Sequence, residues 1–170
     1  ERQNEDGSVV LATLEGTRPL LVEIQALVNP TGFGYPKRTA SGFDLNRLNL
    51  LIAVLERRTK LNLSDKDIYI NVVGGLKIFE PAADLAIAAA IISSEKDKPI
   101  DLKSCFFGEV GLTGEIRGVL LPEIRVKEAI KLGFKNFYLP AAQKNQLDIP
   151  KNKELHFYFL NHIKELNNLI

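Results

Sequence analysis

The chain has 170 residues, of which 45% are hydrophobic and 25% are charged, and its 22 basic side chains nearly balance its 21 acidic ones. This is a globular composition, and it excludes a disordered tail, because near-zero net charge accompanies a normal apolar content. The longest apolar run, residues 85–92, is far shorter than the ~20 residues that span a bilayer, so no membrane partner is expected. The length predicts one domain over residues 1–170, with polar residues 1–7 as a flexible N-terminal extension.

The strand-forming segments at the start of the chain predict a hairpin. Residues 8–14 and 20–28 are hydrophobic or alternate in polarity, and the turn-forming residues between them join the two segments. Residues 29–42 are rich in Gly and Pro and predict an irregular arm, with a short strand near residues 37–40.

Two helices are predicted in the middle of the chain. Residues 44–59 carry one apolar stripe at helical spacing, and Asp44 is suited to begin that helix. Residues 67–73 are rich in β-formers and predict a strand. Residues 81–94 predict a second helix whose middle is apolar on all sides, which is typical of a helix at the centre of a domain.

The second half of the chain alternates between strands and helices. Residues 105–121 hold four glycines among β-formers and predict tight turns between short strands. The later segments are predicted as a helix at 122–132, a strand at 136–139, a turn or short helix at 140–143, a strand at 156–159 and a helix at 160–169. Together these elements predict an α+β fold with helices packed on a mixed sheet.

Cys105 is the only cysteine, which excludes an intrachain disulfide and a cysteine-based zinc site. Its apolar neighbours predict a buried thiol, in keeping with a reducing, cytoplasmic compartment. The chain contains no methionine, so it is expected to be a fragment of a longer protein.

The usual nucleotide and metal motifs are missing from the sequence. Residues 74–77 lack the frame of a phosphate-binding loop, and residues 32–34 are only half of a dinucleotide fingerprint. His156 and His162 are six residues apart with no adjacent carboxylate pair, so no metal site is predicted. No cofactor is therefore expected in this segment.

Five basic side chains are candidates for contacts to the phosphates of DNA, because cations beside loop N–H groups suit such contacts. They are Lys37, Arg38, Arg47, Lys77 and Arg125. The alternative is a solvated surface on which these cations form salt bridges, and the residues alone favour this alternative.

Several motifs in a fixed order resemble those of a known family. They lie at residues 41–48, 74–86, 107–117 and 128–134, and the resemblance extends over about residues 7–145. Together these segments closely resemble the C-terminal Lon-protease-like domains of the bacterial RadA (Sms) DNA repair family. The resemblance implies a Lon-protease-like fold and makes this segment the C-terminal part of a three-part protein.

The same resemblance implies how the whole protein acts. A zinc finger and a RecA-like ATPase would lie upstream, so ATP, Mg and Zn are expected there. The family processes branched or single-stranded DNA as a hexameric ring, and a recombinase or a replicative helicase is a further expected partner. This segment would contribute DNA contacts and ring assembly.

Lon proteases cleave peptides with a Ser–Lys dyad, and this sequence retains neither residue. The position of the nucleophile falls on Ala82 and that of the lysine on Glu123. Without an oxygen nucleophile no acyl-enzyme can form, so no catalytic residue is assigned and the segment is predicted not to be an enzyme. Two alternatives remain: a peptidase that uses other residues, such as Ser41 or Ser93, and an oligomerisation module without DNA contact.

Overall fold

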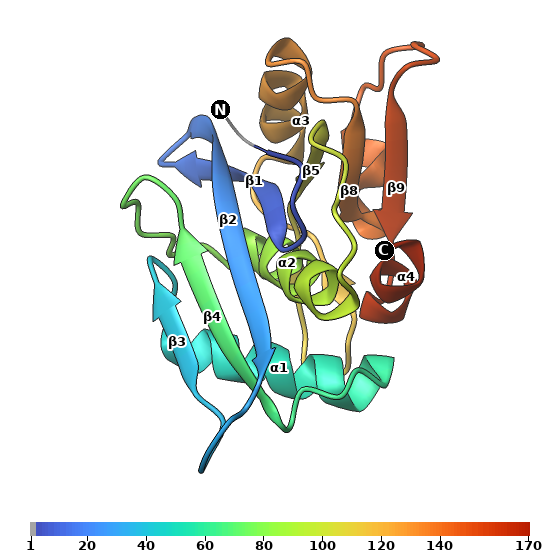
Figure 1. Ribbon diagram of the computed structural model, residues 1–170. Coiled ribbons are helices and arrows are strands. Elements are labelled where there is room, and N and C mark those ends of the chain that lie inside the picture. The colour runs from blue at the N-terminus through green and yellow to red at the C-terminus, as the bar shows by residue number, and fades with distance from the viewer. Residues whose placement is uncertain (1–2) are drawn as a thin grey trace.

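The computed structural model describes residues 3–170, and within that range seven strands form one mixed sheet in the order β3-β4-β2-β1-β5-β8-β9 (Figure 1). The strands of this sheet are β1 (Ser8–Glu15), β2 (Arg18–Pro30), β3 (Arg38–Ser41), β4 (Lys66–Val72), β5 (Ser104–Phe106), β8 (Asn136–Pro140) and β9 (His156–Leu160). A separate small hairpin consists of β6 (Glu109–Val110) and β7 (Ile116–Arg117).

The helical elements include two 3₁₀ turns. They are α1 (Leu45–Thr59), η1 (Pro81–Ala83), α2 (Asp84–Lys96), α3 (Pro122–Lys131), η2 (Ala141–Gln146) and α4 (Ile163–Leu169). In the described part of the chain, no helix combines the length and the apolar character needed to cross a membrane.

The sheet confirms the predicted mixed architecture with helices on its faces. β2 pairs antiparallel with both β1 and β4, as the predicted hairpin requires. The remaining pairings, β3 with β4, β1 with β5, β5 with β8 and β8 with β9, are parallel. The sheet is therefore mostly parallel, because helical connections return the chain to the same end of the sheet.

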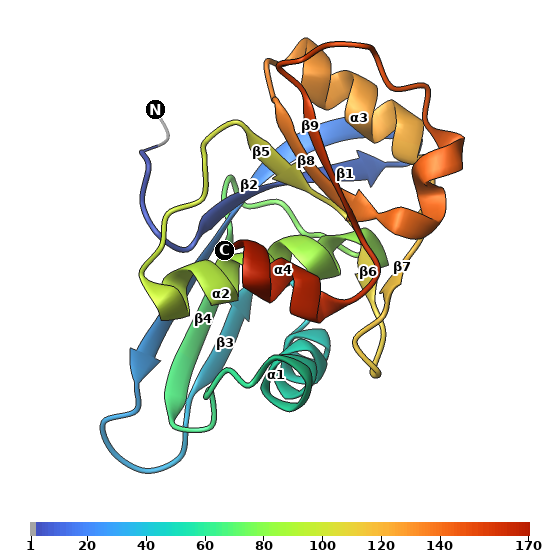
Figure 2. The ribbon, with the colours of Figure 1, turned by 90° about the vertical axis from the view of Figure 1, so that its right-hand side faces the viewer.

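Strand β1 lies at the centre of the sheet and is covered on both faces. Helix α2 packs against β1 and β2 on one side, and α3 contacts the same two strands on the other side (Figure 2). Val9, Leu11 and Ala12 are fully buried as a result. Burial of both faces explains why residues 8–14 are a continuous apolar run rather than an alternating one.

Helix α2 is the central helix that its all-apolar sequence predicts. Its residues from Asp84 to Ser94 are buried, and the helix contacts β1, β2, α1 and α4. The hydroxyl of Ser93 accepts the N–H of Gly7 at 2.9 Å, and the carbonyl of Gly7 accepts the N–H of Ala26 at 2.8 Å. The predicted flexible extension therefore ends before Gly7, which is buried, while residues 1–2 lie outside the described range.

The last helix is shorter than predicted. Strand β9 continues to Leu160, and α4 begins only after His162. The Nδ1 atom of His162 accepts the N–H of Lys164 at 3.1 Å, and Nε2 lies 2.9 Å from the carbonyl oxygen of Thr113. His162 thus caps the helix and fixes it to the β6–β7 turn.

Cys105 is completely buried in β5, as predicted, and this burial raises the pKa of its thiol.

Candidate functional site

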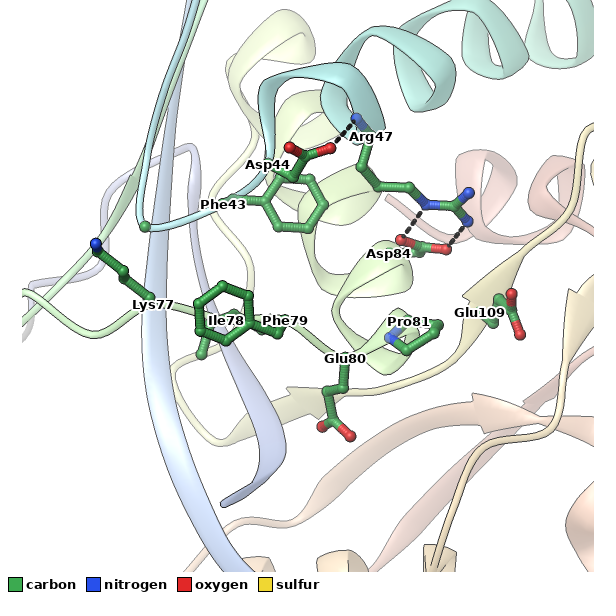
Figure 3. A pocket seen from close by; sticks show the side chains of 11 residues that line it. Phe43, Asp44, Arg47, Lys77, Ile78, Phe79, Glu80, Pro81, Asp84 and Glu109 are labelled. Atoms are coloured by element: carbon green, nitrogen blue, oxygen red, sulfur yellow. Dashed lines mark hydrogen bonds and ion pairs between the residues drawn. The ribbon is translucent and has the colours of Figure 1, made fainter. Parts of the chain in front are cut away.

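A cavity of about 570 Å³ opens between the start of α1, the segment that precedes η1, and the start of α2 (Figure 3). Its lining combines apolar rings with charged side chains from separate parts of the sequence. The lining residues are Gly42, Phe43, Asp44, Arg47, Lys77, Ile78, Phe79, Glu80, Pro81, Asp84 and Glu109.

The wall of the cavity is the strap, which we define as residues 74–80 between β4 and η1. The N–H of Ile78 donates to the carbonyl of Gly42 at 2.8 Å and holds the strap against the start of α1. Gly42 has a φ of 82°, and a Cβ at this position would lie 2.4 Å from the carbonyl oxygen of Leu76. A side chain at residue 42 would therefore push the strap away and deform the cavity.

Helix α1 enters the site through a side-chain cap. The carboxylate of Asp44 accepts the N–H of Arg47 at 2.9 Å, as the sequence predicts. This cap starts the helix so that the Arg47 side chain extends across the cavity floor towards α2 (Figure 3).

The floor of the cavity is an ion pair between Arg47 and Asp84. Asp84 is fully buried, and it accepts hydrogen bonds from Arg47 Nε at 3.0 Å, from Arg47 Nη2, and from the N–H of Val110 at 3.0 Å. Burial raises the pKa of the Asp84 carboxyl, and these hydrogen bonds oppose the rise. The hydrogen bond to Asp84 in turn raises the pKa of Arg47. Arg47 therefore neutralises a buried carboxylate, and its side chain is only 30% exposed.

A second buried pair lies behind the strap. Arg125 has no exposed surface and donates to the carbonyls of Ala12 at 2.8 Å and Leu120 at 2.9 Å, and to Glu80 Oε2 at 2.8 Å. Its guanidinium also lies 5.6 Å from the centre of the Phe107 ring. The prediction that Arg125 contacts DNA is wrong, because its guanidinium is completely buried and cannot reach a phosphate.

Glu80 belongs to this second pair rather than to the cavity chemistry. Its carboxylate points away from Arg47 and Asp84 and also accepts the hydroxyl of Thr13 at 2.8 Å (Figure 3). Burial works to raise the pKa of Glu80, but the hydrogen bonds from Arg125, Thr13 and the N–H of Leu14 outweigh it and hold the pKa below its ordinary value.

The two dyad positions carry no catalytic group. Ala82 is buried in η1, where its carbonyl accepts the N–H of Gly108 at 2.9 Å. Glu123 lies in the first turn of α3 and pairs with Lys127 at 3.2 Å, with both side chains well exposed to solvent. Directly before α2, residue 82 therefore carries a methyl group where the resemblance expects the hydroxyl of the nucleophile.

The alternative nucleophiles differ in accessibility. Ser93 is fully buried, and its hydroxyl donates to the carbonyl of Lys98 at 2.5 Å, so a substrate cannot reach it. Ser41 is exposed at the end of β3. Across residues 3–170, no group of three or more His, Cys, Asp or Glu side chains is placed to hold a metal ion.

The remaining predicted cations lie in two separate places. Lys77 is exposed on the strap at the cavity mouth, and its amine points away from Arg47 (Figure 3). Lys37 and Arg38 lie at the opposite end of β4, about 20 Å away, given the rise of a seven-residue strand. Arg38 donates to the carbonyls of Leu63, at 2.9 Å, and Lys66. Among the five, only Lys37 and Lys77 are exposed.

Sequence reasoning missed the Arg47–Asp84 pair and the exposed ring of Phe79, which is 89% exposed on the strap. A signal for the pair was present. Asp84 is the only charged residue in an otherwise apolar, buried stretch, and such a carboxylate requires a partner.

Comparison with known proteins identifies the family. The family model described as subunit ChlI of Mg-chelatase matches residues 41–143, which is more than half of the chain. The chain belongs to this family. The matched region contains α1, the strap, α2 and the β6–β7 hairpin, so it includes the whole candidate site.

Curated relatives are also highly similar to the chain. DNA repair protein RadA of Bacillus subtilis is 55% identical over 149 residues, a match that covers 88% of this chain and 32% of the relative. DNA repair protein RadA of Listeria monocytogenes is 52% identical, with 88% and 33% covered. RadA of Streptococcus pneumoniae is 53% identical over 145 residues, with 85% and 34% covered.

The chain thus spans about a third of the length of these relatives. Similarity to proteins named RadA agrees with the resemblance seen in the sequence motifs. The family model is named after a chelatase subunit and not after a Lon protease, so the Lon-like subtype of the fold remains a prediction.

Proposed function

We propose that this chain is a non-proteolytic, Lon-like scaffold domain of a RadA-type DNA repair protein, where it contributes DNA contacts and ring assembly. The observation that carries the proposal is the identity of 52% and 55% to relatives named DNA repair protein RadA, over 88% of this chain. At this level of identity the relatives and this chain share a fold, so a related role is the simplest expectation.

The chemistry of the site supports a role without catalysis. Ala82 offers no hydroxyl and Glu123 offers no amine, so a Ser–Lys dyad cannot form at these positions. The one buried carboxylate at the start of α2, Asp84, is neutralised by Arg47 and is not available as a general base. The cavity floor is therefore a structural ion pair, and the nearby position of the nucleophile, Ala82, carries no reactive group.

The charge distribution supports a weak electrostatic contact with DNA. Lys37 and Lys77 are exposed cations on loops, whereas the chain as a whole carries a net charge of only +1. Few phosphate contacts give weak binding by one copy, and several copies held in a ring would raise the apparent affinity. In this proposal a hexameric ring supplies that avidity.

The relatives are about three times as long as this chain, so other parts of such a protein can bind nucleotide and metal. Binding of ATP, Mg and Zn is assigned by this proposal to the two thirds of a RadA-type protein that this chain does not span. Contacts with a recombinase or a replicative helicase belong to the same proposal. The whole protein would act as an ATP-driven motor on single-stranded or branched DNA.

Charge reversal of the two exposed lysines tests the DNA contact. Lys37→Glu with Lys77→Glu is expected to weaken the binding of a labelled oligonucleotide, measured by fluorescence anisotropy at low salt, by about tenfold or more, because two phosphate contacts are lost. The matched control is Lys131→Glu with Lys151→Glu, which makes the same change in net charge at exposed positions elsewhere.

Equal weakening by both double variants would show that only net charge matters and would contradict the assigned contacts. Ring formation with unchanged DNA affinity would favour an oligomerisation module. Incubation with a serine-reactive probe tests the peptidase alternative, and specific labelling of Ser41 would contradict the absence of catalysis.

A further inference from the structure

The loop between β2 and β3 exposes two aromatic rings. Phe33 is 98% exposed and Tyr35 is 92% exposed, and only Gly34 separates them. Rings of this size usually bury most of their surface, so two neighbouring exposed rings mark a binding surface rather than a packing requirement. We name residues 31–36 the aromatic loop.

The base of the aromatic loop is held in place by Asp67 of β4. Its Oδ1 atom accepts the hydroxyl of Thr31 at 3.0 Å and the N–H of Lys37 at 2.8 Å, so one carboxylate ties the two ends of the loop together. The N–H of Thr31 also donates to the carbonyl of Asp65 at 2.8 Å. The aromatic loop therefore extends from a fixed base, beyond the end of the sheet that lies away from α3 (Figure 1).

Two basic residues follow the rings closely in the sequence. Lys37 follows the loop and is exposed, and the guanidinium of Arg38 is fixed at the loop base by the carbonyls of Leu63 and Lys66. The acidic Asp67 at the same place is used internally, because it accepts hydrogen bonds from both ends of the loop. The loop thus combines flat apolar faces at its tip with positive charge at its side.

This combination fits an unpaired nucleic-acid strand. Bases with free faces stack on aromatic rings without regard to sequence, and phosphates between the bases contact nearby cations. In a duplex the base faces are covered by their neighbours, so the rings would find no surface to stack on. An apolar groove for a protein segment would instead need apolar walls, whereas the neighbours of the rings are glycine, threonine, proline and lysine.

We propose that Phe33 and Tyr35 form a base-stacking site for single-stranded nucleic acid, with Lys37 contacting the phosphates. This inference rests on the proposed DNA-binding function and specifies the form of nucleic acid that the chain recognises.

The absence of tryptophan from the chain allows a direct test. Phe33→Trp places a single tryptophan in the loop, and a 20-residue oligothymidylate is expected to quench its fluorescence on binding, because a stacked base contacts the indole ring. Leu132→Trp is the matched control. Leu132 is 56% exposed after α3, at the other end of the molecule, and its tryptophan should not respond.

Removal of the rings supplies the second measurement. Phe33→Ala with Tyr35→Ala is expected to weaken binding of the single strand by about tenfold or more, since each base–aromatic stack contributes substantially to affinity. Binding of a blunt duplex of the same length should change less than twofold. Both positions are exposed, so these variants are expected to fold, and Phe33→Trp should retain the affinity of the original chain.

The outcomes separate this inference from the proposed function. If the alanine variant binds the single strand normally while the Lys37 and Lys77 charge reversal weakens it, DNA binding stands and base stacking is overturned. If no variant, nor the original chain, binds an oligonucleotide, both fail. If the tryptophan fluorescence of Phe33→Trp responds to a protein partner but not to the oligonucleotide, the inference is overturned and the loop is a protein-docking site.

Discussion

At the scale of single residues, the type of each cation determines whether it is bound internally or exposed to solvent. An arginine presents five N–H donors in a planar fork and can satisfy a buried carboxylate and backbone carbonyls together. Arg47 and Arg125 do this, and Arg125 is completely buried, whereas Arg47 is partly buried in the cavity floor. Lysine holds a compact, strongly hydrated charge, and Lys37 and Lys77 remain in water. Among the five candidate cations, the arginines form internal hydrogen bonds and the lysines are exposed to solvent.

The pair of Arg47 with Asp84 predicts a pH-dependent stability. Burial raises the pKa of Asp84 in the folded chain above its value in the unfolded chain. Ionisation of Asp84 at higher pH therefore lowers the stability of the folded chain, and the ion pair with Arg47 offsets part of this loss. Arg47→Gln should lower the free energy of unfolding by about 3 kcal/mol at neutral pH. The loss should shrink as pH falls and Asp84 takes up a proton, because protonated Asp84 no longer needs a cation.

Urea unfolding of both chains over this pH range measures the effect. Arg57→Gln, an exposed change on the same helix, serves as the control and should have little effect. A loss in Arg47→Gln that is independent of pH would show that Asp84 is not the group that Arg47 stabilises.

The candidate site was predictable only in part. The sequence motifs locate the strap, the start of α2 and the missing dyad residues, because those depend on residue identity alone. The partners of the cations depend on contacts between residues 37 to 113 positions apart, such as Arg47 with Asp84 and Arg125 with the carbonyl of Ala12. Local patterns carry no information on such contacts, which is why Arg125 was wrongly placed at the surface.

At the scale of elements, periodicity predicts most helices and strands. The hairpin of β1 and β2, the capped helix α1 and the buried helix α2 all follow from local spacing and capping residues. The order of strands does not follow, because β1 pairs with β5 across nearly a hundred residues. The late start of α4 depends on a tertiary contact as well, since His162 also reaches the β6–β7 turn.

Arg125 fixes one element to the rest of the fold, and its removal should show this. The side chain connects α3 to β1 and to the strap through Ala12 and Glu80. Arg125→Ala removes the guanidinium that pairs with Glu80 and takes a donor from the carbonyls of Ala12 and Leu120. The free energy of unfolding should therefore fall by about 3 kcal/mol. Lys127→Ala, which removes an exposed ion pair on the same helix, should cost less than about 1 kcal/mol.

Chemical denaturation of both variants checks this difference. Similar losses in Arg125→Ala and Lys127→Ala would mean that the buried pair does not hold α3 in place.

At the scale of the whole molecule, the fold separates a packed interior from two exposed features. The interior contains α2 with the buried Asp84, the buried Arg125 and the lost dyad position Ala82. The strap with Lys77 and the aromatic loop with Lys37 lie at opposite ends of β4. A strand of nucleic acid that contacts both features would follow the outer edge of the sheet along β3 and β4 over about 20 Å, the length of a few nucleotides.

The salt dependence of single-strand binding tests the central proposal most directly. Each phosphate neutralised on a single strand contributes about −0.7 to the slope of log K against log salt concentration. Contact through both lysines predicts that the slope for the original chain is steeper by about 1.4 than for Lys37→Gln with Lys77→Gln. Equal slopes, or an affinity that does not change with salt, would contradict a DNA contact at these two residues.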